Sequence, residues 1–228
     1  ASYLNAEFKV GTSKITFTEN QLHRIVLEYG EAIMHIQFIY NSYLKNTPWD
    51  IDFELDLSKP GKVLTPQEHY LIGNELQRNG IKLSSICLDP LKDAEAVNDN
   101  LQLHCEIADT FGYRLSFKNA DISMNDTAAA MKYLKGKVHF KMNNILWMSA
   151  IELAKALDAD LFGKLCAACG CEPTADAADR ALVLGYRKAL NPKEEGNVVA
   201  DMKAFLEAHH AEYAAAIKEN VAAKLKNI

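Results

Sequence analysis

Polar side chains that could carry out acid–base or anion-binding chemistry recur where the predicted strands end. The set is Glu54, Asp56, Asp89, Lys118, Asn119, Asp121, His139, Lys141, Asn143 and Asn144. Because the carboxyl ends of parallel strands meet at one edge of a sheet, we expect these residues to converge on one rim. Carboxylates can move protons there, and lysines can hold a substrate carboxylate. The set therefore suits a sugar acid or another hydroxy acid, although ordinary loop and strand-end polarity would explain the same residues.

A divalent cation at this rim would need carboxylate and imidazole ligands. The candidates are Asp56, His69, which follows Glu68 in the first turn of a predicted helix, and His139, which lies in a predicted strand. The sequence contains no HExxH, GxSxG, Walker A or GxGxxG motif. We therefore expect neither a nucleotide cofactor nor simple nucleophilic chemistry.

The elements that must position these residues alternate between strand and helix from Asp50 to Leu157. The predicted strands cover 50–57, 81–88, 113–117 and 137–142, and the clearest helix begins at Thr65-Pro66 and ends at Asn79-Gly80. Crossover helices between short apolar strands predict an α/β fold with a parallel sheet covered by helices. Four to five strands are too few for a complete eight-strand barrel, so we expect a partial TIM-type barrel or an open sheet.

The flanking segments extend this pattern at both ends. Lys14 to Phe17 alternates like a strand, and Thr18 caps a predicted helix that reaches about Asn46. The C-terminal third is predicted to be helical, with helices over 146–157, 160–168 and 175–190 and a long last helix over 196–227. With no evident linker, we expect a single α/β domain over 1–228, in which strand–helix units cover about 14–157 and a helical region covers about 158–228.

Composition excludes several functional classes. The net charge is −5 and no run of basic residues gathers on one face, so we expect no nucleic acid partner. No stretch approaches the roughly 20 apolar residues that span a bilayer, so we expect no membrane association. Five cysteines without framework spacing predict reduced thiols and a cytoplasmic protein. The C-x-x-C-x-C run at Cys166, Cys169 and Cys171 is interpreted mainly as small buried side chains at a helix end.

Four segments resemble the bacterial tagaturonate epimerase family, in the same order. They are FELDLSKPGKVLTPQEHYLIGNELQRNGIKLSSI, GYRLSFKNAD, GKVHFKMNNILWMSAI and HHAEYAAAIKENVAAKL. The family's counterparts are an FE…D strand with a TTPxEH helix start, GYKLSxHSGSD, an FHxKTAGTxWLEAL segment and a closing helix. The resemblance implies a TIM-barrel-like scaffold and metal-dependent epimerisation of a ketouronate.

The resemblance also implies roles for individual residues. Glu54 would be the acidic proton-transfer group, His139 a second catalytic residue or metal ligand, and Lys118 or Lys141 the anchor of the substrate carboxylate. Asn119 and Asp121 would contact the substrate. Lys118 stands where the family has a metal-binding histidine, and an ammonium has no lone pair for a cation.

Three hypotheses follow from these similarities and departures. The chain could be a diverged relative that binds a sugar acid or a protein without turnover, and Lys118 favours this reading. It could also be an active enzyme completed by further polypeptide, or a structural or regulatory module that assembles through its last helix. If the chain is a shortened relative, active or inactive, its sheet has an open edge that must be covered. We therefore expect dimerisation or another homo-oligomer.

Overall fold

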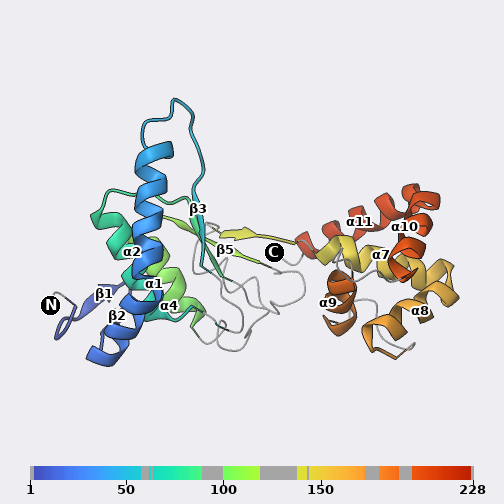
Figure 1. Ribbon diagram of the computed structural model, residues 1–228, viewed down its shortest axis with the longest axis horizontal. Coiled ribbons are helices and arrows are strands. Elements are labelled where there is room, and N and C mark those ends of the chain that lie inside the picture. The colour runs from blue at the N-terminus through green and yellow to red at the C-terminus, as the bar shows by residue number, and fades with distance from the viewer. Residues whose placement is uncertain are drawn as a thin grey trace. The chain divides into compact units, whose positions relative to one another are not determined.

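The computed structural model describes residues 3–57, 62, 64–88, 100–118, 138–142, 144–172, 180–189 and 197–226. Contacts divide the chain into two compact units, one of residues 1–118 and 126–141 and one of residues 119–125 and 142–228. Figure 1 shows the strands in the first unit and only helices in the second. The single domain expected from the sequence stays a prediction.

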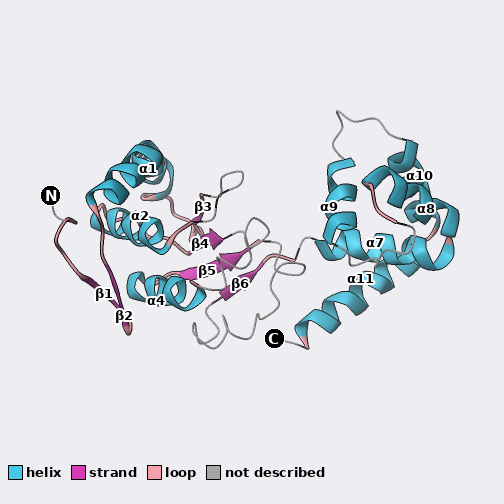
Figure 2. Ribbon diagram, turned by 90° about the horizontal axis from the view of Figure 1, so that it is seen from below, coloured by secondary structure: helices cyan, strands magenta, loops and turns pink. Residues whose placement is uncertain are grey.

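The first unit is built on a four-stranded parallel sheet of order β3-β4-β5-β6. Its strands are β3 (Glu54–Asp56), β4 (Ser85–Leu88), β5 (Arg114–Phe117) and β6 (Val138–Phe140). The helices between them are α2 (Pro66–Arg78) and α4 (Leu101–Phe111). This alternation, visible in Figure 2, confirms the predicted α/β fold, and within the described ranges the sheet is open, as in a partial barrel.

Two threonines fix where the main helices of this unit begin. The Thr65 hydroxyl accepts a hydrogen bond from the Glu68 amide at 3.3 Å, and the Glu68 carboxylate accepts one from the Thr65 amide at 2.8 Å. Thr18 makes the same reciprocal pair with Gln21 at the start of α1 (Glu19–Ile39). Such capping boxes satisfy amides that a helix start leaves without partners. Both N-termini are therefore as predicted.

The N-terminal region differs from the prediction in three ways. β2 (Ser13–Ile15) forms an antiparallel hairpin with β1 (Phe8–Val10), a strand that the sequence analysis did not identify. The helix that begins after Thr18 ends at Ile39 and continues as a π-helical turn over Tyr40–Leu44. The strand predicted over Lys14 to Phe17 ends at Ile15.

A buried polar chain joins α2, α4 and β5. His69 Nδ1 lies 2.9 Å from His104 Nδ1, and His69 Nε2 lies 2.8 Å from the Tyr113 hydroxyl. All three residues are buried. Burial lowers the pKa of His104 to about 4, lowers the pKa of His69 and raises that of Tyr113. Both imidazoles are therefore neutral at neutral pH, consistent with a hydrogen-bonded chain that begins at the Tyr113 O–H.

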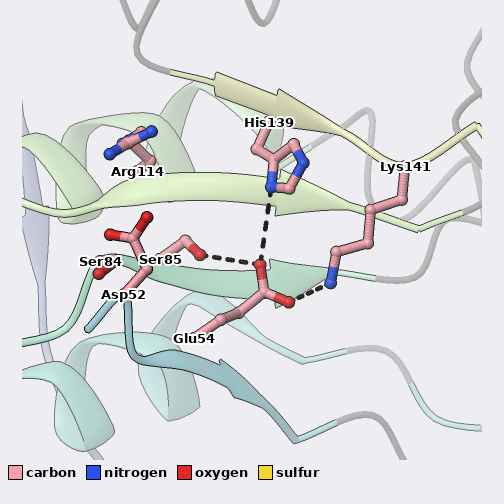
Figure 3. A pocket seen from close by; sticks show the side chains of 7 residues that line it. All are labelled: Asp52, Glu54, Ser84, Ser85, Arg114, His139 and Lys141. Atoms are coloured by element: carbon pink, nitrogen blue, oxygen red, sulfur yellow. Dashed lines mark hydrogen bonds and ion pairs between the residues drawn. The ribbon is translucent and has the colours of Figure 1, made fainter. Parts of the chain in front are cut away.

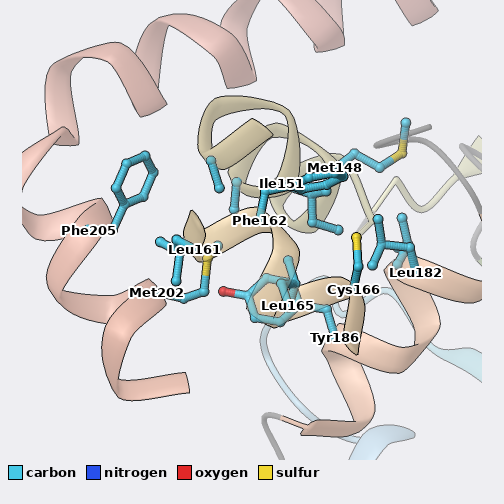
Figure 4. Packing of buried hydrophobic residues seen from close by; sticks show 13 residues of the cluster. Met148, Ile151, Leu161, Phe162, Leu165, Cys166, Leu182, Tyr186, Met202 and Phe205 are labelled. Carbon is cyan, nitrogen blue, oxygen red and sulfur yellow. The ribbon is translucent and has the colours of Figure 1, made fainter. Parts of the chain in front are cut away.

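The second unit is a helical cluster around its own apolar core. Its helices are α7 (Asn144–Leu157), α8 (Ala159–Cys169), α9 (Arg180–Ala189), α10 (Asn197–Ala208) and α11 (His210–Leu225). Ile151, Leu165, Leu182 and Met202 are fully buried where α7 to α10 meet (Figure 4). The predicted long last helix is wrong, because the chain breaks near His209 into α10 and α11.

The end of α8 agrees with the interpretation of the cysteine run. Gly170 adopts a φ of 69°, and the Cys171 amide donates to the Cys166 carbonyl at 2.8 Å, as in a Schellman C-cap. Cys166 is buried, while Cys169 and Cys171 are partly buried, and none is in a disulfide.

Within the parts of the chain that the structure describes, no helix is long and apolar enough to cross a membrane.

The buried histidine pair predicts acid-sensitive stability. Because the folded state holds these pKa values below the ordinary 6.5, the unfolded chain binds more protons once the pH falls below that value. The free energy of unfolding should therefore be highest above pH 6.5 and fall as the pH drops toward 4, by roughly 3 kcal/mol from His104 alone. His104→Gln keeps a hydrogen-bonding side chain that cannot titrate, and urea unfolding at several pH values should show a shallower decline. A decline equal to that of wild type and of the surface variant His23→Gln would contradict this account.

Candidate functional site

The pleat of the parallel sheet separates apolar from polar side chains. Leu55, Ile86, Leu115 and Phe117 are buried. Because successive strand residues point to opposite sides, the alternate positions share the other side of the sheet. We call that side the polar face, and its members are Glu54, Asp56, Ser85, Cys87, Arg114, Ser116 and His139, with Lys118 and Lys141 directly after their strands.

Glu54 is the centre of the interactions on the polar face (Figure 3). Its carboxylate pairs with the Lys141 ammonium and accepts a hydrogen bond from the Ser85 hydroxyl at 2.8 Å. His139 Nδ1 lies 3.9 Å from Glu54 Oε2, too far for a direct hydrogen bond. Glu54 comes from β3, Ser85 from β4 and His139 from β6, and Lys141 directly after β6 lies 87 positions from Glu54 in the sequence.

The surroundings of Glu54 hold it in the ionised form. Partial burial raises its pKa, but hydrogen bonds from Lys141 and Ser85 lower it more, so the net pKa lies below the usual value. For Lys141, burial lowers the pKa and the bond to Glu54 raises it, with a raised pKa as the result. At neutral pH the pair is thus a carboxylate and an ammonium, each stabilising the charge of the other.

A second carboxylate–lysine pair lies further along the same face. Asp56 pairs with Lys118, which directly follows β5. The Lys141 ammonium also lies 3.9 Å from the Cys87 sulfur. Burial raises the pKa of Cys87 to about 11, so its thiol stays protonated and is not an activated nucleophile.

A pocket of about 220 Å³ opens over the polar face. It is lined by Asp52, Glu54, Ser84, Ser85, Arg114, His139 and Lys141. Glu54, His139 and Lys141 were predicted as site residues, but Asp52, Ser84, Ser85 and Arg114 were not. Asp52 and Ser84 precede their strands, and Ser85 and Arg114 begin theirs, as Glu54 also does, so these residues lie away from the carboxyl ends where the site was expected.

The structure unites only part of the predicted site. Glu54, Asp56, Lys118, His139 and Lys141 all belong to the polar face. His69 does not join them, because it is fully buried in the chain formed with His104 and Tyr113. Asn144 begins α7 and is buried in the second unit. The predicted residues Asp89, Asn119, Asp121 and Asn143 lie outside the described residues.

The described side chains do not form a site that fits a divalent cation. No three His, Cys, Asp or Glu groups gather suitably anywhere in the described ranges. The two carboxylates of the polar face already pair with ammonium groups. A cation would have to displace Lys118 and Lys141, which cannot themselves act as ligands while protonated. We therefore assign no chemical step to a metal.

Lys141 should control the acidity of Glu54. Lys141→Met removes the ammonium but keeps an unbranched side chain of similar length, so the Glu54 pKa should rise. A ¹³C-NMR titration of the glutamate carboxyl groups would measure this pKa. Lys14→Met, which removes the exposed partner of Glu7, is the matched control and should leave the Glu54 titration unchanged. An unshifted Glu54 in Lys141→Met would show that the pair does not set its acidity.

Comparisons with known proteins identify relatives of this chain. A curated tagaturonate/fructuronate epimerase from Thermotoga maritima is 25% identical over 174 residues, which are 72% of this chain and 36% of that protein. Two crystal structures of the fructuronate-tagaturonate epimerase from Cohnella laeviribosi share the fold. The one with one glycerol bound has a TM-score of 0.82 at 20% identity, and the native one has 0.78 at 21%. Each match covers 99% of this chain and 55% of the other chain.

The chain thus spans about half the length of its solved relatives and about a third of the curated one. The structural likeness supports the fold. The family model for tagaturonate epimerase matches residues 1–179, which is most of the sequence and includes the whole sheet. This chain belongs to the tagaturonate epimerase family.

Proposed function

We propose that the polar face binds a uronate-type sugar acid and inverts one of its hydroxyl-bearing carbons by proton transfer. The observation that carries this proposal is the Glu54 carboxylate, held ionised by Lys141 and Ser85 and facing a pocket. Family membership and relatives named as tagaturonate/fructuronate epimerases supply the substrate class. The chain covers only part of those relatives. That it shares the activity of the full-length relatives is therefore part of the proposal.

Inversion by proton transfer needs a base that removes a proton from one side of the carbon and an acid that delivers a proton to the other side, because return to the same side would restore the starting configuration. We assign the removal to Glu54. A carboxylate with a lowered pKa is a weak base, so the resting Glu54–Lys141 pair is not yet suited to that task. If hydroxyl oxygens of the bound ligand draw the Lys141 ammonium away, Glu54 loses its strongest stabilising partner. Its pKa then rises and its carboxylate becomes a stronger base. Substrate binding would in this way activate the proton-transfer group.

His139 can assist at the same place. Its side chain is 57% exposed, and its Nδ1 lies 3.9 Å from Glu54 Oε2, so a ligand hydroxyl placed beside the two atoms could form a hydrogen bond to each. An imidazole there can donate to or accept from a substrate oxygen while Glu54 handles a proton. We assign His139 the role of polarising this oxygen.

A second candidate is a sugar-acid-binding relative without turnover. Lys118 favours it, because this ammonium stands where the resemblance places a metal-binding histidine and it pairs with Asp56. The two candidates differ in one measurable property. The inactive form binds a sugar acid and leaves it unchanged, whereas the enzyme interconverts tagaturonate and fructuronate.

Replacing Glu54 tests the proposed catalysis. Glu54→Gln keeps the size and hydrogen-bonding reach of the side chain but removes the base, so kcat should fall by about 10²–10⁴-fold. Interconversion of tagaturonate and fructuronate can be followed by NMR, with circular dichroism to confirm the fold. The control is Glu106→Gln, the same change on α4, where the Glu106 carboxylate accepts from Thr12 at 2.7 Å. Wild-type turnover by Glu54→Gln would refute the assigned role, and sugar-acid binding without turnover by the wild type would favour the inactive relative.

A further inference from the structure

We propose that Arg114, and not Lys118 or Lys141, binds the carboxylate of the sugar acid. The inference rests on the proposed function and names the group that selects an acidic sugar over a neutral one. Arg114 begins β5 and lines the same pocket as Glu54 and Lys141.

The first argument is the distribution of charge around the pocket. Lys141 is engaged with Glu54, and Lys118 is engaged with Asp56. The Arg114 guanidinium has no hydrogen bond or ion pair to any residue that the structure describes. A ligand carboxylate can reach Arg114 without breaking an existing pair, whereas either lysine would first have to leave its own carboxylate. Guanidinium is also the cation whose planar fork matches both oxygens of a carboxylate.

The second argument is the register of the sheet. Glu54 pairs with Ser85, and Ser85 pairs with Arg114, so the three lie side by side across β3, β4 and β5. β3 and β5 are two places apart in the sheet and are therefore separated by about 10 Å. Glu54 and Arg114 both point to the polar face. A ligand whose carboxylate meets Arg114 therefore extends its hydroxyl-bearing carbons toward Glu54. Figure 3 shows Arg114 and Lys141 at opposite ends of this group of side chains.

The remaining lining groups suit a polyhydroxy acid better than a simple anion. The Ser84 hydroxyl accepts a hydrogen bond from the Phe53 amide at 3.0 Å, which leaves its own proton available for a ligand oxygen. Asp52 carries a carboxylate that would repel a bare anion but accepts hydrogen bonds from hydroxyl groups. Arg114, together with several hydroxyl-binding groups and a lysine already paired with Glu54, is the complement of one carboxylate on a hydroxylated carbon chain.

The test compares two sugars that differ in the acidic group. Galacturonate and galactose share their ring hydroxyls, and only galacturonate carries a carboxylate. Calorimetric titration of the full chain should show that the wild type prefers galacturonate. Arg114→Gln should weaken galacturonate binding by about 10–100-fold and leave galactose binding unchanged, because one charge-assisted bidentate contact is lost. Arg114→Lys should fall between the two, since it restores the charge without the fork.

Control variants separate this inference from the proposed function. Arg78→Gln changes an exposed arginine that pairs with Glu75 on α2, and it should bind both sugars as the wild type does. If Arg114→Gln keeps the preference for galacturonate while Lys118→Gln or Lys141→Gln abolishes it, the assignment to Arg114 is wrong and the sugar-acid site stands. If the wild type binds neither sugar and interconverts no uronate, the proposed function fails and this inference fails with it.

Discussion

The two-residue repeat of the parallel sheet is the constraint on which the site depends. Each strand offers one side to the helices and the other to the pocket, so the polar-face residues within a strand alternate with residues of the opposite side. Ser116 shows this plainly, because Leu115 and Phe117 beside it are both fully buried. Shifting β5 by one residue would move Arg114 off the polar face and place the apolar side chains there. Core packing and site geometry are therefore fixed by the same register.

Pairing of opposite charges explains how a small sheet can carry several charged side chains on one face. Two carboxylates and two ammonium groups lie on it in pairs, partly buried, and each pair cancels its own net charge. Breaking a pair by removing one partner leaves a partly buried charge with less compensation, which costs free energy. The lysines thus have a structural role before any ligand arrives, and that role makes Arg114 the better group to receive an acidic ligand.

Local signals in the sequence were sufficient for the strand–helix order of the parallel sheet. Thr65, Pro66 and Glu68 marked one helix start, and the strand–helix order from Asp50 to Leu157 is confirmed within the described residues. The site was only partly accessible from sequence. Glu54, His139 and Lys141 could be found as charged or titratable side chains in or directly after predicted strands, but Arg114 in its strand looks like any exposed arginine. His69 looked like a rim residue, since nothing local reveals that His104, 35 positions away, would pair with it in the core.

Other differences also arise from tertiary contacts. No proline or glycine lies at the break between α10 and α11. The Tyr213 hydroxyl at the start of α11 donates a hydrogen bond to the Leu146 carbonyl of α7 at 3.0 Å. Packing against α7 thus accounts for a bend that propensity alone would not predict. In the sheet, β3 pairs only with β4 and β6 only with β5 among the described strands. A second copy of the chain would cover such edges, and that assembly stays a prediction.

The charge balance of the polar face bears on the metal implied by the family resemblance. Glu54 and Asp56 together carry two negative charges, and Lys118 and Lys141 carry two positive charges. A divalent cation between the same carboxylates would supply the same total charge. Lys118, in the place of a histidine ligand, removes an electron-pair donor and adds a positive charge that would repel such a cation. One substitution thus changes both the coordination and the electrostatics, and the described residues balance their charges with the lysines alone.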